Sequence, residues 1–85
     1  MLNQKMKNIE LLNKVDFDAE EWASIVMGIR KSLNLSQNDL ASKLGFSRYT
    51  PMRYENCLDI PRKDSIIKVL KFIEQNNLNL EILKR

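Results

Sequence analysis

Apolar side chains recur every three or four residues along most of the chain, which is the spacing of one face of an α-helix. The longest such stripe consists of Trp22, Ile25, Val26, Ile29 and Leu33. Asp18 followed by Glu21 has the pattern of a capping box, so we expect this helix to begin at Asp18. Gly28 lowers helix propensity by about 1 kcal/mol relative to Ala, and it leaves room for another helix to pack closely.

The stretch from Ser36 to Asn56 predicts two short helices with almost no linker between them. Ser36 is a good N-cap, and Asp39 completes a capping box that places negative charge in the first turn. The apolar face of the first helix consists of Leu40, Ala41 and Leu44. Gly45 suits the left-handed residue that ends a helix, and Ser47 is expected to cap the second helix. Helices joined so closely cross at a steep angle, which is the geometry of a helix-turn-helix.

The second of these helices carries long polar and amphipathic side chains on the side that a core would not need. They are Arg48, Tyr49, Met52, Arg53 and Asn56. Arg and Asn have donor and acceptor groups that match the purine edges exposed in the major groove of DNA. This face is therefore a candidate for reading a DNA sequence.

A further helix is expected after Pro61, with Asp64 as its N-cap. Its buried stripe is expected to consist of Ile66, Ile67, Leu70 and Ile73. The tail from Asn76 to Arg85 is ambiguous, because its apolar residues alternate like a strand but also fit a short helix, which we favour. Those residues are Leu78, Leu80, Ile82 and Leu83. They are too many for a free tail, so we expect them to cover the core or to form part of a homodimer contact.

The N-terminal arm, residues 1–17, has apolar residues at helical spacing and predicts a short helix at about Ile9 to Lys14. Its basic residues are Lys5, Lys7 and Lys14. The arm could pack on the domain or on a second subunit, or it could lie on DNA phosphates. We favour packing, because Glu10, Asp16 and Asp18 cancel most of the positive charge.

Length and composition indicate one small domain. With 85 residues, 44% of them hydrophobic and 29% charged, the chain resembles an ordinary soluble globular protein. Its formal net charge of +3 is compatible with a polyanionic partner but does not by itself indicate one. No run approaches the roughly 18 apolar residues of a membrane span, and the first residues lack the apolar segment of a signal peptide. These features predict a cytoplasmic protein, associated with the nucleoid when it binds DNA.

The residue types that the chain lacks exclude several kinds of chemistry. It contains one Cys and no His, so an internal disulfide, a structural zinc site and His-based catalysis are excluded. The sequence shows no paired carboxylates in a plausible pocket and no Gly-rich phosphate loop. We therefore expect a protein that is not an enzyme, with no cofactor and no metal site.

The register of apolar, capping and polar residues resembles the Cro/CI-type (XRE-type) helix-turn-helix DNA-binding domain. The matching positions are Ile29, Arg30, Leu35, Ser36, Gln37, Leu40, Ala41, Leu44, Gly45, Ser47, Thr50, Tyr54 and Glu55. The resemblance extends over about Glu21 to Ile73, and so many matches in one register make it specific. It implies an all-α, lambda-repressor-like domain of five to six helices at residues 18–75, between the arm and an apolar tail at residues 76–85.

The resemblance also implies a sequence-specific regulator of transcription, expected to repress, that binds double-stranded DNA as a homodimer at an inverted repeat. The bases would be read by Arg48, Tyr49, Met52 and Arg53. The DNA backbone would be contacted by Ser36, Gln37, Ser47, Thr50, Asn56 and Arg62. In the family, the residues at the positions of Arg30 and Glu55 form a structural ion pair between the first helix and the end of the recognition helix.

Two positions depart from the family pattern. Pro51 stands where the family has Ile or Val, so it removes one amide donor and predicts a tight or bent first turn, with its ring still able to be buried. Cys57 stands where the family has Gly in a left-handed conformation, and a residue other than Gly is strained there by about 1 kcal/mol. Alternatively, Asn56 adopts that conformation, or the loop differs from that of the family. Tyr54 falls at a core position of the family.

Several functions remain open within this resemblance. Small members of the family are commonly phage regulators, or antitoxins that bind a toxin and repress their own operon, and the sequence does not separate the two. A toxin or a phage protein therefore stays open as a further partner. Another alternative is a protein-interaction adaptor that keeps the fold but does not bind DNA. Pro51 and the modest net charge favour the adaptor, whereas Arg48 and Arg53 argue against it.

Overall fold

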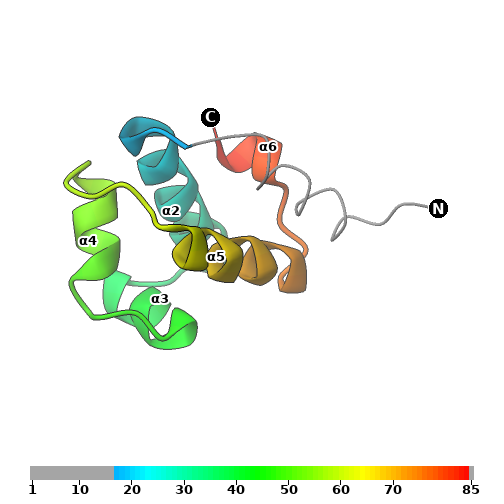
Figure 1. Cartoon of the computed structure of the whole chain (residues 1–85). Helices are drawn as coiled ribbons and strands as arrows, with labels where there is room; N and C mark the ends of the chain where they lie inside the picture. Colours follow the sequence, from blue (N-terminus) through cyan, green and yellow to red (C-terminus); the bar gives the residue numbers. More distant parts are fainter. Residues whose placement is uncertain (1–16, 85) are drawn as a thin grey trace.

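A computed structural model describes residues 17–84, which form a compact all-α globule of five helices without a strand (Figure 1). The helices are α2 (Ala19–Leu33), α3 (Gln37–Leu44), α4 (Thr50–Glu55), α5 (Lys63–Gln75) and α6 (Leu80–Leu83). The short helix and the basic residues predicted in the N-terminal arm lie outside the described residues. None of the helices within residues 17–84 is both long enough and apolar enough to cross a membrane.

Helix α2 runs through the middle of the described fold, with α4 on one side and α6 on the other (Figure 1). Helix α3 packs against both α4 and α5, so the two short helices follow each other around one end of the molecule. The helix predicted in the tail is confirmed as α6. Gly28 allows this close packing on α2, because a Cβ atom there would approach Leu83 Cδ2 to 2.7 Å and the Leu83 side chain would have to shift.

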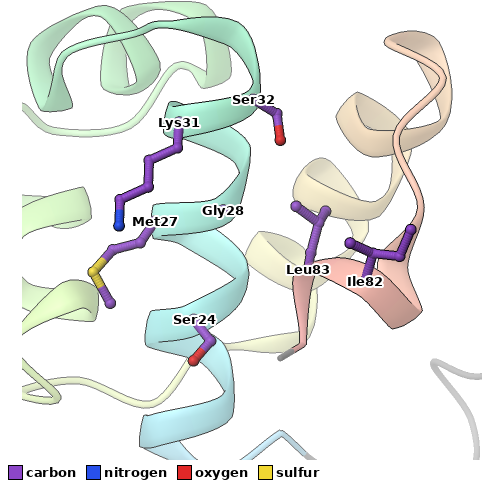
Figure 2. Close-up of a pocket in the computed structure, with 7 residues that line it drawn as sticks. All are labelled: Ser24, Met27, Gly28, Lys31, Ser32, Ile82 and Leu83. Atoms are coloured by element: carbon purple, nitrogen blue, oxygen red, sulfur yellow. The ribbon is translucent and has the colours of Figure 1, made fainter.

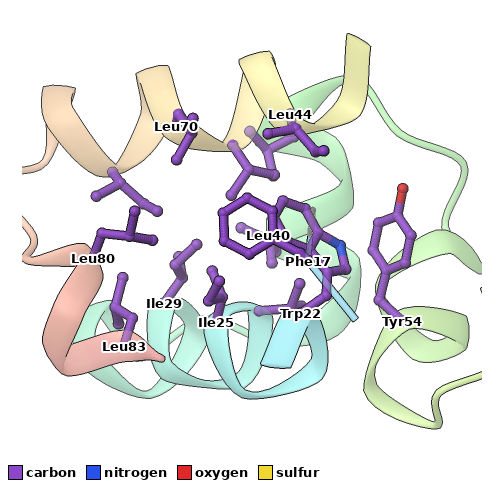
Figure 3. Close-up of a cluster of buried hydrophobic side chains, with 14 residues drawn as sticks. Phe17, Trp22, Ile25, Ile29, Leu40, Leu44, Tyr54, Leu70, Leu80 and Leu83 are labelled. Atoms are coloured by element: carbon purple, nitrogen blue, oxygen red, sulfur yellow. The ribbon is translucent and has the colours of Figure 1, made fainter. Parts of the chain in front are cut away.

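One apolar core joins all five helices (Figure 3). It consists of Phe17, Trp22, Ile25, Val26, Ile29, Leu40, Leu44, Tyr54, Ile66, Val69, Leu70, Ile73, Leu80 and Leu83. Burial of Tyr54 and of the Pro51 ring agrees with the expectations from sequence. The stripe predicted for α5 was wrong at one position, because Val69 is buried while Ile67 is only half-buried.

Asp18 and Ser36 are confirmed as the N-caps of α2 and α3, and the structure shows the complete capping box at Ser36. The Asp18 carboxylate accepts a hydrogen bond from the Glu21 amide at 2.7 Å. The Asp39 amide donates to Ser36 Oγ at 3.0 Å, and the Ser36 amide donates to the Asp39 carboxylate at 3.1 Å, which completes a capping box. These bonds from Ser36 hold the pKa of Asp39 below its usual range. Local sequence patterns therefore determine where α2 and α3 begin.

Ser47 was wrongly predicted as the N-cap of α4, which begins at Thr50 with Tyr49 before it. A helix capped by Ser47 needs its first hydrogen bond from the amide four residues later, and that residue is Pro51, which has no N–H. The Thr50 amide donates to the Ser47 carbonyl instead, at 3.0 Å, and closes the tight turn that Pro51 predicts. Ser47 Oγ accepts only a long bond of 3.3 Å from the Tyr49 amide.

Asp64 was also wrongly predicted as an N-cap. The N-cap is Arg62, two residues earlier, so α5 begins at Lys63 and its first intrahelical bond runs from the Ile66 amide to the Arg62 carbonyl at 3.0 Å. Arg62 makes no side-chain cap bond. Asp64 lies in the first turn, where a negative charge is still favourable because it faces the positive end of the helix dipole.

Four helices end in the same left-handed turn. The residues with positive φ are Asn34 (56°), Gly45 (70°), Cys57 (57°) and Asn77 (57°). In each turn, the amide of the following residue reaches back to a carbonyl five residues earlier, at 2.8 to 2.9 Å. Asn and Gly tolerate this conformation, whereas Cys is strained in it. Of the possibilities left open by the sequence, the structure shows a left-handed Cys57, whereas Asn56 has a negative φ.

Replacing Cys57 by Gly should therefore raise the free energy of unfolding by about 0.5–1 kcal/mol, because the relief of left-handed strain exceeds the entropy that Gly gains in the unfolded chain. Urea unfolding in the presence of a reducing agent measures the change. Asn34→Gly is the matched control, and it should give a smaller gain because Asn already tolerates a positive φ. A loss of stability in Cys57→Gly would contradict this account of the turn.

Candidate nucleic-acid interface

The first turns of α3 and α4 meet around an open hollow on the surface. It is lined by Gln37, Asn38, Arg48, Tyr49 and Met52. The structure therefore brings together three of the four predicted base-reading residues and one predicted backbone contact. Asn38 was not identified from the sequence, although its place next to Gln37 in the first turn of α3 is the signal that could have shown it.

Arg48 and Tyr49 form one unit at the rim of this hollow. Arg48 Nη2 donates a hydrogen bond to Tyr49 Oη at 2.6 Å, and the guanidinium carbon lies 4.8 Å from the centroid of the Tyr49 ring. Tyr49 is 53% exposed, so this contact takes place at the surface. Stacking on an aromatic ring limits the orientations of a guanidinium group and leaves most of its donors facing outward.

Below the hollow, Glu55 connects three helices. Arg30 Nε and Nη2 donate to the two carboxylate oxygens of Glu55 at 2.6 and 2.7 Å. Gln37 Nε2 donates to Glu55 Oε1 at 3.2 Å. The Glu55 side chain is only 7% exposed, and its hydrogen bond raises the pKa of Arg30 above its ordinary value. The two residues that the resemblance pairs are thus in contact, and the same carboxylate fixes one side of the Gln37 amide.

Arg53, the fourth predicted base-reading residue, lies outside the lining of the hollow. Its Nε donates to Asp59 Oδ2 at 2.7 Å and its Nη2 donates to Asp59 Oδ1 at 3.1 Å. These bonds hold the pKa of Asp59 below its usual range and raise the pKa of Arg53. Asp59 follows α4 in the loop, and its partner could not be identified from the sequence.

The predicted backbone contacts differ in how free their side chains are. The Ser36 hydroxyl takes part in the capping box, and Ser47 Oγ accepts the bond from Tyr49. Asn56 Nδ2 donates to the Met52 carbonyl at 2.8 Å, which satisfies a carbonyl at the end of α4. Arg62 is exposed at the start of α5, and Thr50 is half-buried at the start of α4.

A second hollow lies between α2 and α6 (Figure 2). Its lining residues are Ser24, Met27, Gly28, Lys31, Ser32, Ile82 and Leu83. Of the four apolar residues predicted in the tail, Leu80 and Leu83 are buried in the core, whereas Ile82 is 64% exposed. The tail therefore mainly covers the core of its own chain. Within residues 17–84, no group of three or more Cys, Asp or Glu side chains is placed to hold a metal ion.

Comparisons with known proteins add no assignment to this geometry. No family model, no curated protein and no solved structure matches the chain.

Proposed function

We propose that this protein is a lambda-repressor-like, Cro/CI-type helix-turn-helix domain that binds double-stranded DNA with sequence preference. The observation that supports this proposal is the convergence of Gln37, Arg48, Tyr49 and Met52 on one exposed hollow where α3 and α4 meet. These are long side chains with outward donors or apolar tips, placed on short, well-anchored helices. Such an arrangement suits a surface that reads the edges of base pairs.

The dimensions of α4 fit the major groove. An α-helix with its side chains is about 10–12 Å across, and the major groove is about 12 Å wide, so the six-residue α4 can enter it. Helix α3 would lie across the DNA backbone, with the free N–H groups of its first turn and the Gln37 side chain directed at a phosphate. Met52 on α4, together with Arg48 and Tyr49 in the turn before it, would then read bases, while Arg62 would contact the backbone at the start of α5.

A single α4 can cover only a few base pairs, so we propose that the protein acts as a homodimer on an inverted repeat with half-sites about 34 Å apart. We propose that this binding represses a nearby promoter in the cytoplasm. This role needs neither a cofactor nor catalysis. Ile82, exposed beside the second hollow, is one apolar candidate for a contact between subunits, and Leu58 and Ile60 are exposed as well.

The alternative functions have weaker support. An antitoxin would need a segment for its toxin, and among residues 17–84 the candidate is the apolar tail, whose Leu80 and Leu83 are buried in the core. An adaptor that does not bind DNA would be favoured by an acidic outer face on α4. That face carries Arg48 and Arg53, and the neighbouring Asp59 is neutralised by its pairing with Arg53.

The proposal is tested by selecting bound duplexes from a random-sequence library and measuring their affinity by fluorescence anisotropy against scrambled duplexes. We expect a selected inverted repeat and a clear preference over scrambled DNA that persists across a salt series, while both affinities fall with salt. If the wild-type protein selects no sequence and binds no duplex at low salt, the DNA-binding proposal is wrong and the adaptor function takes its place.

Arg48→Ala should reduce the preference for the selected duplex by about tenfold, because one bidentate contact to a base is lost. Affinity for scrambled DNA should change much less. Lys71→Ala is the matched control, since Lys71 is an exposed cation on α5 that does not line the hollow. An equal effect of the two substitutions would show that Arg48 contributes only charge.

A further inference from the structure

The ion pair between Arg53 and Asp59 has no function in the hollow formed by α3 and α4. We propose that Asp59 is a positioning residue that sets the base preference of Arg53. It binds the Nε and Nη2 side of the Arg53 guanidinium, so that the end edge of that group, formed by Nη1 and Nη2, faces one guanine. This inference rests on the proposed function, and it assigns a specificity role to a residue in the loop after α4.

The geometry of the pair defines which donors stay free. Asp59 accepts from Nε and Nη2 of Arg53 through separate carboxylate oxygens, at 2.7 and 3.1 Å, so the two groups form a planar, two-bond contact. A guanidinium has five N–H donors, and three remain after this contact. Two of them form the end edge, which is the edge that matches O6 and N7 of guanine.

The left-handed turn at Cys57 makes this contact possible. In that turn the Leu58 amide donates to the Arg53 carbonyl at 2.8 Å, and the Cys57 amide donates to the Tyr54 carbonyl at 3.1 Å. The chain therefore reverses direction directly after α4, and Asp59 returns to the last turn of the helix. The backbone of this turn fixes the position of Asp59. Arg53 is therefore held by a short side chain and not by a second long, flexible one.

Stability does not account for the pair. The Arg53 and Asp59 side chains are 47% and 43% exposed, and ion pairs with such access to water contribute little to folding. A carboxylate next to the DNA-facing helix also repels phosphates, and its pairing cancels the attraction that Arg53 alone would exert on them. Asp59 thus lowers affinity for DNA in general while it orients one base-reading group. Removing the charge of Asp59 should therefore raise the affinity for DNA in general and lower the preference for one base pair.

This prediction is tested with Asp59→Asn, using the duplex selected by the wild-type protein, its single-base variants and a scrambled duplex. Asp59→Asn should bind the scrambled duplex more tightly, since one negative charge is removed. It should also lose about tenfold in preference at a single base pair, the same one at which Arg53→Ala loses preference. Asp59→Glu should keep most of that preference, and the double variant Arg53→Ala/Asp59→Asn should lose no more than Arg53→Ala.

Asp64→Asn is the matched control, because it removes one exposed negative charge in the first turn of α5 without touching Arg53. It should leave the preference at every base pair unchanged. If Asp59→Asn keeps the preference of the wild type and only tightens binding to all duplexes, Asp59 is merely a competing charge and the inference is wrong. If the wild-type protein selects no duplex, both the inference and the proposed function are overturned.

Discussion

Replacing Trp22 by Ala should lower the free energy of unfolding by about 4 kcal/mol, the cost of removing a large aromatic side chain from a packed core. Trp22 is fully buried in α2 and packs against Phe17 on one side and Tyr54 of α4 on the other (Figure 3). The ring centroids are 5.3 and 5.7 Å apart, respectively, and the contact with Tyr54 is edge-on. Because domains of this size are stable by only about 5–15 kcal/mol, the loss should leave the variant marginally folded.

The measurement is urea unfolding followed by far-ultraviolet circular dichroism, since Trp22 is the only Trp and its variant has no Trp fluorescence. In the wild-type protein, the Trp22 emission should be shifted to the blue and should shift to the red on unfolding. Tyr49→Ala is the control, because it removes an exposed aromatic residue next to α4 and should change stability by no more than about 0.5 kcal/mol. A loss of less than about 1 kcal/mol in Trp22→Ala would contradict the packing between α2 and α4.

The parts of the fold that follow from short stretches of sequence were predicted well. The apolar stripe of α2, the caps at Asp18 and Ser36 and the left-handed Gly45 depend on residues within one or two turns of each other. The errors in the starts of α4 and α5 have equally local causes, which the pattern of capping residues alone does not show. Pro51 removes the hydrogen bond that a helix capped by Ser47 would need, so α4 starts late, and nothing prevents α5 from starting directly after Arg62.

The candidate interface was predicted as a set of residues but not as an arrangement. Helical periodicity shows that Arg48, Tyr49 and Met52 share one side of the chain, and the structure brings Gln37 to the same hollow. Periodicity cannot show where a long, flexible side chain ends. Arg53 therefore appeared equivalent to Arg48, although Arg48 stacks on Tyr49 and Arg53 is paired with Asp59.

Such partners depend on how the loop after α4 returns to the helix. That path is fixed by a left-handed Cys57, at a position where sequence alone left two residues as candidates. The same limitation applies to the tail, where spacing could not decide between a dimer contact and the core. The close approach of Leu83 to Gly28 places the tail on α2, and this contact joins residues more than fifty positions apart in the chain.

Arg30→Ala should lower the free energy of unfolding by about 3 kcal/mol, because it leaves the Glu55 carboxylate buried without its charge partner. We take the lower end of the range for buried pairs, since the Arg30 side chain is 22% exposed while that of Glu55 is 7% exposed. The substitution also removes the bond from Arg30 Nη1 to the Leu35 carbonyl at 3.2 Å, which supports the turn between α2 and α3. The hydrogen bond with Glu55 also raises the pKa of Arg30 above its ordinary value, so the guanidinium stays protonated.

Lys31→Ala is the matched control for Arg30→Ala, because it removes a neighbouring exposed cation from the same helix turn and should change stability by no more than about 0.5 kcal/mol. The double variant Arg30→Ala/Glu55→Gln should lose less than the sum of the two single variants, since the buried charge is then removed together with its partner. A near-zero loss in Arg30→Ala, or strictly additive losses, would show that the contact does not stabilise the fold. Glu55 accepts hydrogen bonds from both Arg30 and Gln37, so without Arg30 the carboxylate should hold the Gln37 side chain less firmly. We therefore expect both Arg30→Ala and Arg30→Gln to weaken DNA binding at temperatures where the variant is still folded.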